Sequence, residues 1–382
     1  MTLAQRWDDA LAHVETFRDA TRVGNARVLL GLMGPAMRGF VLQKGKRGDS
    51  ADVRGANTTR FSWTYERDRP QMAQLTRKAR QQQWDPEHAL DWDTTVDPMD
   101  PERELWPEAL TPLVEVPAYH ALPARTKAAH RQAFLSWVLS QFLHGEQGAL
   151  FAACQVTEAV QWMDGKLFGS MQVAEEGRHV EVFHRYLTEK LGKLYQINDN
   201  LYVIIDALMT DGRWDMKFLG MQIMIEGLAL GGFGTIRAAT REPLLQKLLQ
   251  YVIADEARHV HFGVLALAEH FAQLSHRELK DREDWAFEMA LLLRNRFLAH
   301  EFYDEFYGHL MTKREWNRIM LGCGIMQAFR KTMFRRIVPN LKRIHLLSDR
   351  IRPHYAAIGL LAWENEKAAP ELSVDEILAE PL

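Results

Sequence analysis

The sequence feature that most constrains the fold of this chain is a set of acidic and histidine residues that repeats after eighty positions. Each copy contains a lone glutamate and, thirty residues later, a Glu-x-x-His motif. The six repeated residues are Glu146, Glu176, His179, Glu226, Glu256 and His259. Two matched copies are a far stronger signal than one Glu-x-x-His motif, which arises easily by chance. Four carboxylates and two imidazoles are the ligand set with which four-helix bundles hold two metal ions.

The spacing of these residues predicts how the chain folds around them. Glu176 and His179 are three positions apart, so on a helix they share one face and reach a common ion. The thirty residues from Glu146 to Glu176 allow roughly 13 residues down one helix, a turn, and roughly 13 up an antiparallel one. The fifty residues from Glu176 to Glu226 are too many for a tight turn and predict a long crossover connection. A four-helix bundle with one long crossover has the ferritin-like topology.

The surroundings of the lone glutamates favour a bound cation over the alternative, a pair of surface side chains in salt bridges. Glu146 precedes the apolar run 148–153, and Glu226 has apolar residues on both sides. A glutamate buried there is a costly charge unless something compensates it. A carboxylate-rich set without thiolates suits iron(II) or manganese(II) better than zinc or copper. We therefore expect two iron ions, with manganese as the alternative in one or both positions.

Residues from about 140 to 272 resemble the ferritin-like, carboxylate-bridged di-iron proteins. This family includes bacterial multicomponent monooxygenase hydroxylases, benzoyl-CoA epoxidase, acyl-carrier-protein desaturases, aryl-amine N-oxygenases and the small subunit of ribonucleotide reductase. The strings Glu175-Glu-Gly-Arg-His179 and Asp255-Glu-Ala-Arg-His259 are similar to the acid-Glu-x-Arg-His signature of the hydroxylases and desaturases. The resemblance implies that the six repeated residues bind iron. It also implies that Glu175 and Asp255 hydrogen-bond the free nitrogens of the histidines, with Arg178 and Arg258 next to them.

Three departures from the patterns of this family narrow the expected reaction. Ribonucleotide reductase small subunits usually carry a radical tyrosine four residues after the first motif's histidine, where this chain has Phe183. Hydroxylases and desaturases typically carry a threonine four or three residues after the third glutamate, where this chain has Leu230 and Ala229. Aryl-amine N-oxygenases have an extra histidine ligand at the position of Val252. The chain therefore differs from the best-known branches that it resembles.

The remaining sequence predicts an all-α protein built around this bundle. We expect an N-terminal helical arm and proline-rich connector at 1–125, the di-iron four-helix bundle at 126–275, and further helices packing on it at 276–382. Hydrophobic periodicity predicts helices at 1–42, 68–84, 126–156, 160–190, 200–210, 214–240, 242–272, 281–310, 313–336 and 339–365. A mobile loop is expected at 45–57, and the six prolines between 98 and 123 predict an extended connector.

Composition and charge bear on partners and location. A net charge of −3 gives no reason to expect nucleic acid or an anionic membrane as partner. Two cysteines outside any motif, and an N-terminus without a signal-type apolar stretch, favour the cytoplasm. Eight basic residues between 330 and 352, against Asp349 alone, have two interpretations. They form either a docking face for a ferredoxin, an acyl carrier protein or coenzyme A phosphates, or, as we favour, a solvated surface balanced by the acidic tail.

The leading functional interpretation is a dioxygen-dependent di-iron monooxygenase. It would hydroxylate, epoxidise or desaturate a small organic substrate, free or linked to a carrier or coenzyme A, with electrons from a ferredoxin or flavin reductase; a homodimer is compatible with the sequence. Small or apolar residues near the ligands are candidates for the substrate pocket: Ala149, Ala153, Phe183, Gly227 and Leu230. The alternatives with the same ligand set are an amine N-oxygenase, a radical-generating small subunit, and a ferroxidase or iron-storage protein.

Overall fold

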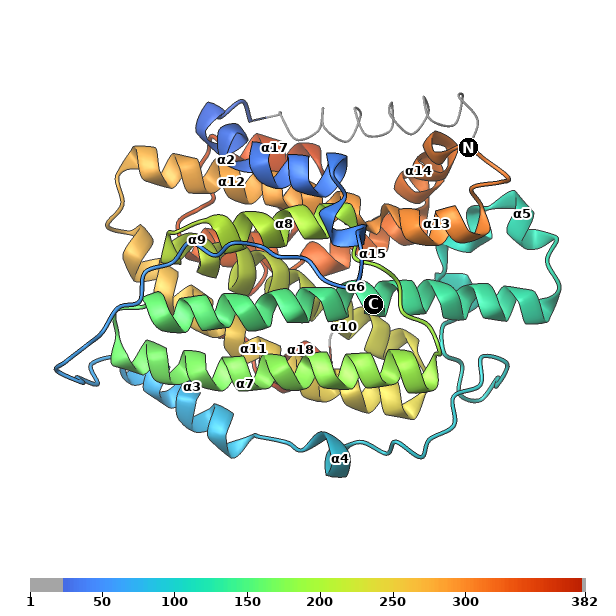
Figure 1. Ribbon diagram of the computed structural model, residues 1–382, viewed down its shortest axis with the longest axis horizontal. Helices are drawn as coiled ribbons and strands as arrows, with labels where there is room; N and C mark the ends of the chain where they lie inside the picture. The colour runs from blue at the N-terminus through green and yellow to red at the C-terminus, as the bar shows by residue number, and fades with distance from the viewer. Residues whose placement is uncertain (1–22, 380–382) are drawn as a thin grey trace.

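The computed structural model describes residues 23–379, and every regular element in that range is helical (Figure 1). The all-α prediction is confirmed, since no β-strand occurs between residues 23 and 379. The first part of the helical segment predicted at 1–42 lies outside the described residues. Its remainder forms α2 (Ala26–Ala36) and the π-helical turn η1 (Met37–Val41).

Four long helical segments form the centre of the molecule, within a few residues of the predicted bounds. They are α6 (Ala124–Ala159), α7 (Met163–Arg185), the continuous helix made of α9 (Trp214–Phe218), η6 (Leu219–Ile225) and α10 (Glu226–Ala239), and α11 (Pro243–Phe271). In Figure 1, α6 and α7 run side by side along the long axis of the molecule.

Local sequence explains how these helices are connected. Glu242 caps α11, because its carboxylate accepts hydrogen bonds from the main-chain N–H groups of Leu244 and Leu245, and Pro243 fits the first helical position. Residues 240–242 therefore make a tight turn between α10 and α11, and residues 160–162 make another between α6 and α7. Residues 186–213 form the long connection that the spacing predicted, and they contain η5 (Tyr186–Lys190) and α8 (Asp199–Thr210).

The π-helical segment η6 ends at Ile225, directly before Glu226. A π-helical turn holds extra residues, so it changes the direction in which the following side chains point, and such turns are frequent at functional sites. η6 also lies very close to α11, because a Cβ atom added at Gly263 would be 2.5 Å from the Cβ of Gln222. A glycine at this position therefore allows the two helices to approach each other.

The segment before the bundle lies against its outer face. α3 (Pro70–Gln81), predicted at 68–84, packs on α7 and α11, and α4 (Pro86–Ala89) follows it (Figure 1). The loop predicted at 45–57 begins at a short turn, η2 (Lys44–Lys46). The proline-rich connector is not fully extended, because prolines also fit the first positions of short helical turns. These turns are η3 (Glu108–Leu110), η4 (Pro112–Glu115) and α5 (Pro117–His120).

The helices after the bundle are shorter than predicted. The expected long helices 281–310, 313–336 and 339–365 are each interrupted, at Ala299, Cys323 and His345 respectively. Ala299 and His345 have left-handed backbones with φ of 52° and 65°, and Cys323 is extended with ψ of 126°. The resulting elements are α12 (His276–Asn295), η7 (Arg296–Leu298), α13 (His300–Phe306), α14 (Lys313–Gly322), α15 (Gly324–Phe334), α16 (Ile337–Arg343), α17 (Arg352–Ala357), η8 (Leu361–Trp363), η9 (Ala369–Glu371) and α18 (Val374–Leu378).

One helix, Trp214–Ala239, is long and apolar enough to cross a membrane by length and composition. However, 83% of its most apolar stretch is buried inside the protein. Its side chains belong to a hydrophobic cluster shared with the other central helices, where each large apolar side chain contributes about 1.5–3 kcal/mol by its burial. Its apolar character is thus that of a central core helix.

Candidate metal centre

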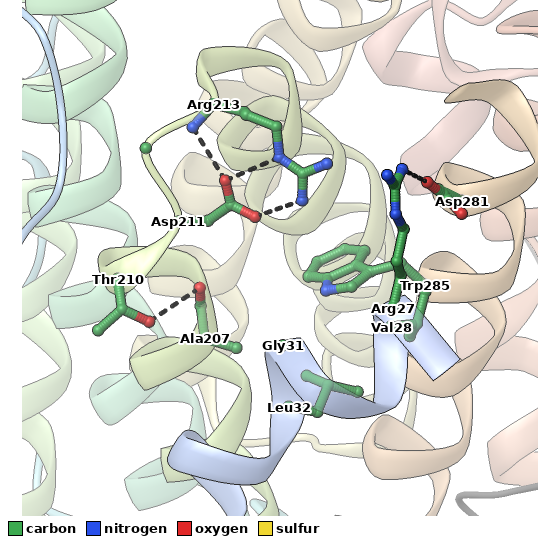
Figure 2. Close-up of a pocket in the computed structure, with 11 residues that line it drawn as sticks. Arg27, Val28, Gly31, Leu32, Ala207, Thr210, Asp211, Arg213, Asp281 and Trp285 are labelled. Atoms are coloured by element: carbon green, nitrogen blue, oxygen red, sulfur yellow. Dashed lines mark hydrogen bonds and ion pairs between the residues drawn. The ribbon is translucent and has the colours of Figure 1, made fainter. Parts of the chain in front are cut away.

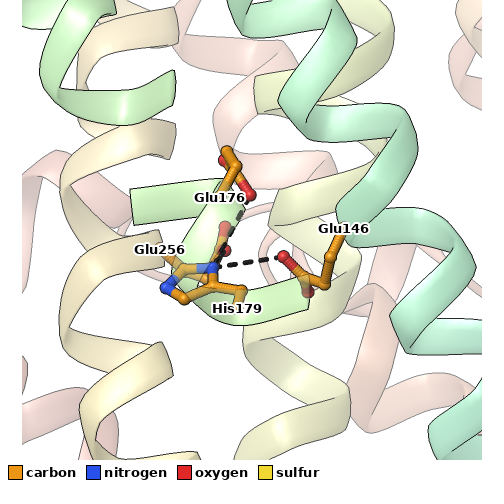
Figure 3. Close-up of side chains that lie close together, drawn as sticks. All are labelled: Glu146, Glu176, His179 and Glu256. Carbon is orange, nitrogen blue, oxygen red and sulfur yellow. Dashed lines mark hydrogen bonds and ion pairs between the residues drawn. The ribbon is translucent and has the colours of Figure 1, made fainter. Parts of the chain in front are cut away.

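The six repeated residues meet in the middle of the bundle. All are buried, with at most 5% of each residue exposed. One comes from α6, two from α7, one from α10 and two from α11: Glu146, Glu176, His179, Glu226, Glu256 and His259. Figure 3 shows Glu146, Glu176 and Glu256 gathered around the ring of His179.

These residues form two groups, each with three carboxylates and one imidazole. Within a group, one ligand atom of every residue lies within 4.8 Å of the others. The first group consists of Glu146, Glu176, His179 and Glu256, and the second of Glu176, Glu226, Glu256 and His259. Glu176 and Glu256 belong to both groups, so their carboxylates are placed to bridge two ions.

The Nδ1 atom of each histidine faces the carboxylates. His179 Nδ1 lies 3.2 Å from Glu146 Oε2 and 3.1 Å from Glu256 Oε1. His259 Nδ1 lies 3.0 Å from Glu176 Oε1 and 3.5 Å from Glu256 Oε2. The centroids of the two imidazole rings are 6.0 Å apart. Each group thus offers one ring nitrogen and three carboxylates to a single ion.

The other ring nitrogen of each histidine contacts the acid of the opposite motif. His179 Nε2 lies 3.1 Å from Asp255 Oδ2, and His259 Nε2 lies 2.8 Å from Glu175 Oε2. A carboxylate can only accept, so Nε2 donates and Nδ1 is left to face the cluster. The sequence predicted that these acids would hydrogen-bond the histidines. The structure adds that the pairing is crossed, which links α7 to α11.

The arginines of the two motifs hold these acids in place. Arg178 Nη2 donates to Asp255 Oδ2 at 2.8 Å, and Arg258 Nη2 donates to Glu175 Oε1 at 2.8 Å. Arg258 also donates to Asp255. Although burial opposes it, His179 and the two arginines hold the pKa of Asp255 well below its usual range. Asp255 therefore stays ionised and able to accept the hydrogen bond from His179.

Two residues after α3 also donate hydrogen bonds to these acids, and sequence reasoning missed them. Gln83 Nε2 donates to Glu175 Oε1 at 2.8 Å, and Trp84 Nε1 donates to Asp255 Oδ2 at 2.9 Å. The guanidinium of Arg178 also lies over the Trp84 ring, 4.6 Å from its centroid. Their sequence signal is a polar helix ending at a Trp-Asp-Pro turn, and such a turn does not reveal which distant side chains it contacts.

Gln172 and Gln222 are two further buried residues that sequence reasoning missed. Gln172 Nε2 donates to Glu176 Oε1 at 3.1 Å and to Glu226 Oε1 at 2.9 Å, while Gln222 Nε2 donates to Gln172 Oε1 at 3.3 Å. Each glutamine precedes a ligand glutamate by four positions, which is one helical turn. That spacing was visible in the sequence and could have identified both.

Several ligand atoms of the cluster have no hydrogen-bond partner among the described residues. They are Glu176 Oε2, Glu226 Oε2, both carboxylate oxygens of Glu256, and His259 Nδ1. A buried polar atom without a partner costs about 1–3 kcal/mol, so native structures contain few of them. Four carboxylates also carry four negative charges, which two divalent cations would balance. The residues present therefore fit a pair of metal ions.

The pKa values of the ligands also reflect the crowding of carboxylates at this site. Burial and the neighbouring Glu256 raise the pKa values of Glu146 and Glu226 well above their usual range. Although burial opposes it, the surrounding carboxylates raise the pKa values of His179 and His259 well above theirs. Without metal, the cluster therefore holds protons where cations would lie, and metal binding would release them.

A small cavity adjoins the cluster. Its volume is about 10 Å³, enough for about one water molecule. Three ligands line one side, namely Glu146, Glu226 and Glu256. The other lining residues are Gln141, Phe142, Gly145, Ala149, Ile225, Ala229 and Arg296. The site is thus largely enclosed by apolar side chains, with one arginine among them.

Only one of the predicted pocket residues lines this small cavity. Ala149, three positions after Glu146, lines the cavity, but the other four candidates do not. Phe183 is buried against Phe233, with ring centroids 5.5 Å apart. The remaining candidates, Ala153, Gly227 and Leu230, are buried without reaching the cavity wall. Helical rotation explains the difference, because Ala229, at the third position after Glu226, faces the cavity instead.

A larger groove, of about 460 Å³, lies between α2, α8 and α12 (Figure 2). Its charged side chains are already paired with one another. Arg213 Nη2 contacts Asp211 Oδ2 at 2.7 Å, and Arg27 Nη1 contacts Asp281 Oδ2 at 3.0 Å. The groove therefore lacks the unpaired polar atoms that distinguish the small cavity.

The basic stretch 330–352 has partners within the chain. Arg330 and Arg336 are buried and donate to main-chain carbonyl oxygens. Other cations pair with acids: Arg335 with Glu366, Lys342 and Arg352 with Glu364, and Arg350 with Glu283 and Asp284. These contacts favour a charge-balanced surface over a docking face.

Comparison with known proteins gives no assignment. The chain matches no family model, and no curated protein matches it. The interpretation of this centre therefore rests on the donor atoms, their burial and their missing partners.

Proposed function

We propose that this chain is a non-haem di-iron oxygenase of ferritin-like fold that uses dioxygen to oxidise an organic substrate. The observation that carries this proposal is the pair of buried three-carboxylate, one-imidazole groups that share Glu176 and Glu256. Oxygen-rich donor sets with a single imidazole per ion suit iron(II) and manganese(II). The long connection between α7 and α9 supports the ferritin-like part of this proposal.

The residues have distinct roles in this proposal. Glu176 and Glu256 would help to hold both ions, Glu146 and His179 would hold one of them, and Glu226 and His259 would hold the other. When bound, the iron pair would supply the redox chemistry, passing two electrons from a ferredoxin or flavin reductase to dioxygen. Asp255 and Glu175 fix the orientation of the imidazole rings through the Nε2 hydrogen bonds. A cytoplasmic location would provide the electron donor.

In a hydroxylation, one oxygen atom of dioxygen enters a substrate C–H bond and the other leaves as water. Two electrons and two protons are consumed. The reacting carbon would lie in the cavity beside Glu146 and Glu226. Phe142 and Ile225 on its wall exclude bulk water, which protects a reactive oxidant from wasteful side reactions.

The test is anaerobic iron(II) loading followed by exposure to labelled dioxygen. We expect about two irons per chain and incorporation of label into products from a panel of acyl, aryl and amine substrates. Glu256→Gln should lose both results. Glu181→Gln is the matched control, because Glu181 is exposed on α7 and lies outside the cluster.

Other outcomes would identify the alternatives. A mineral core of many irons per chain would indicate iron storage. A stable organic radical after oxygenation would indicate a radical-generating subunit. Normal iron loading in Glu256→Gln would refute the assignment of the ligands themselves.

A further inference from the structure

Arg296 is a charged side chain that the proposed di-iron chemistry does not use. Only 2% of the residue is exposed, and it lines the same small cavity as Glu146, Glu226 and Glu256. Its guanidinium contacts the rings of Phe142 and Phe297, at 5.8 and 4.8 Å from their centroids. No hydrogen bond or ion pair joins this side chain to another residue between 23 and 379, and its Nε has no partner there.

The other buried arginines between residues 23 and 379 each have at least one hydrogen-bond acceptor for their guanidinium. Arg258 and Arg282 contact carboxylates at 2.8 and 2.7 Å, and Arg330 donates to a carbonyl oxygen at 2.9 Å. A buried charge without a partner is strongly unfavourable. Burial lowers the pKa of Arg296 to about 9, so the side chain still carries its charge at neutral pH. Arg296 therefore lacks an anion that its counterparts have.

The carboxylates of the centre do not supply that anion. Their four negative charges equal the four positive charges of two divalent ions, so the charge of Arg296 remains unbalanced when both ions are bound. The helical segment that carries Arg296 ends nearby at Ala299, which has a left-handed φ of 52°. Such a conformation costs a non-glycine residue about 1 kcal/mol or more.

The shape of the site limits which anion fits. The cavity beside Arg296 has room for about one water molecule, so an anion that enters it must displace neighbouring side chains, and a flat group displaces them least. A second cavity of about 10 Å³ lies next along α6 and is lined mainly by apolar side chains, including Phe134, Phe297 and Ile325, together with Trp106, whose Nε1 has no hydrogen-bond partner among the described residues. A planar carboxylate matches the guanidinium fork, and an apolar body matches the second cavity.

We propose that Arg296 binds the carboxylate of the substrate, and that the substrate class is a carboxylic acid with an apolar body. This inference rests on the proposed oxygenase function, because it places the carbon atoms next to the carboxylate beside the ligands Glu146, Glu226 and Glu256. A ligand seated there would widen the two cavities, of which Arg296 lines one and its chain neighbour Phe297 lines the other.

The test measures binding rather than turnover. Calorimetry on manganese-loaded protein compares hexanoate and phenylacetate with the neutral probes hexanamide and phenylacetamide. We expect each acid to bind about 10- to 100-fold more tightly than its amide, as for hydrogen bonds to a charged group. Arg296→Met should remove this preference while keeping about two manganese ions per chain, and Arg296→Lys should keep part of it. Arg343→Gln, at an exposed position, is the control.

A second measurement separates binding from a structural role. Removing an unpaired buried charge should raise the melting temperature of ligand-free Arg296→Met by about 2 °C or more. A lower melting temperature with an unchanged preference would show a structural arginine and overturn the inference. Equal binding of acid and amide by the parent protein would also overturn it. So would a preference that persists in Arg296→Met, since the metal ions alone would then hold the acid.

The two proposals fail in different ways. If the protein binds acids through Arg296 but takes up no iron pair and consumes no dioxygen, the oxygenase proposal fails and the carboxylate site stands. If iron loading and dioxygen consumption occur without any preference for acids, the inference about Arg296 fails alone.

Discussion

Two groups of buried acids in this molecule contrast with each other. Glu301, on α13, has only 8% of its side chain exposed, and both of its oxygens are satisfied. It accepts hydrogen bonds from Lys46 Nζ at 2.7 Å, Trp137 Nε1 at 2.9 Å and Asn198 Nδ2 at 3.2 Å. Glu256, in the metal centre, is more deeply buried, with 1% of the residue exposed, but it has no hydrogen-bond donor for either oxygen among the described residues.

The pKa values follow the same division. Although burial opposes it, Lys46 and Trp137 lower the pKa of Glu301 to about 2. Burial and neighbouring acids instead raise the pKa values of Glu146 and Glu226. A buried carboxylate with its partners inside the chain is part of the fold. Buried carboxylates without them require positive charge from outside the polypeptide, and this distinguishes the centre from an ordinary ionic network.

The largest expected effect comes from Glu256→Gln. Because Glu256 belongs to both ligand groups of the metal centre, we expect the variant to lose both ions and the stability that they confer. That stability is about 5 kcal/mol when each of two sites is at 100 times its dissociation constant. The metal-free variant should be at least as stable as the metal-free parent, since it buries one charge less. Urea unfolding with and without manganese(II) measures both free energies of unfolding. If manganese stabilises Glu256→Gln as much as it stabilises the parent, Glu256 does not hold the metal and the contrast with Glu301 is wrong.

Glu301→Ala should behave in the opposite way. It leaves Lys46, Trp137 and Asn198 without their common acceptor, so the free energy of unfolding should fall by about 4 kcal/mol. The loss should be the same with and without metal, and about two ions should still bind per chain. A loss that appears only in the metal-bound protein would show that Glu301 belongs to the centre after all.

Much of this contrast could be predicted from sequence, but not all of it. The repeat predicted which six residues would meet, because helix periodicity and segment length decide that question. Hydrophobic periodicity predicted the central helices, and the family resemblance implied the two acids beside the histidines. The break at Ala299, and with it the position of Arg296, depends on tertiary contacts that override a helical pattern. The contacts of Gln83 and Trp84 join segments far apart in the chain, so no local pattern reveals them.

The low pKa of Glu301 predicts how stability depends on pH. Glu301 is a stronger acid in the folded chain, at about 2, than at its ordinary value of 4.5, so its contribution is fully present above about pH 5. The contribution is lost as the pH falls toward 2, and the difference between the two pKa values corresponds to about 3 kcal/mol. Urea unfolding of the parent and of Glu301→Gln at pH 6, 4 and 3 should give a stability difference that shrinks with acid. A constant difference would contradict this assignment.

The smallest effect, and the sharpest test, concerns Glu175. This residue combines the satisfied contacts of Glu301 with a position beside the metal centre. It is buried beside the centre, yet Gln83, Arg258 and His259 all donate to it. Glu175→Gln would place an amide NH₂ group against one of these donors, so His259 would lose its fixed orientation. We expect metal affinity to fall about 10- to 100-fold, as for other partners of metal-binding histidines.

Because Glu175 also has the satisfied contacts of a structural acid, the metal-free variant should lose about 2 kcal/mol of stability. Manganese titration and urea unfolding of the same samples separate the two effects. Glu181→Gln, exposed on the same helix, should change neither. A loss of affinity without a loss of stability would place Glu175 wholly with the metal centre. The reverse result would place it with the structural acids, and the crossed pairing would then serve the packing of α7 on α11 alone.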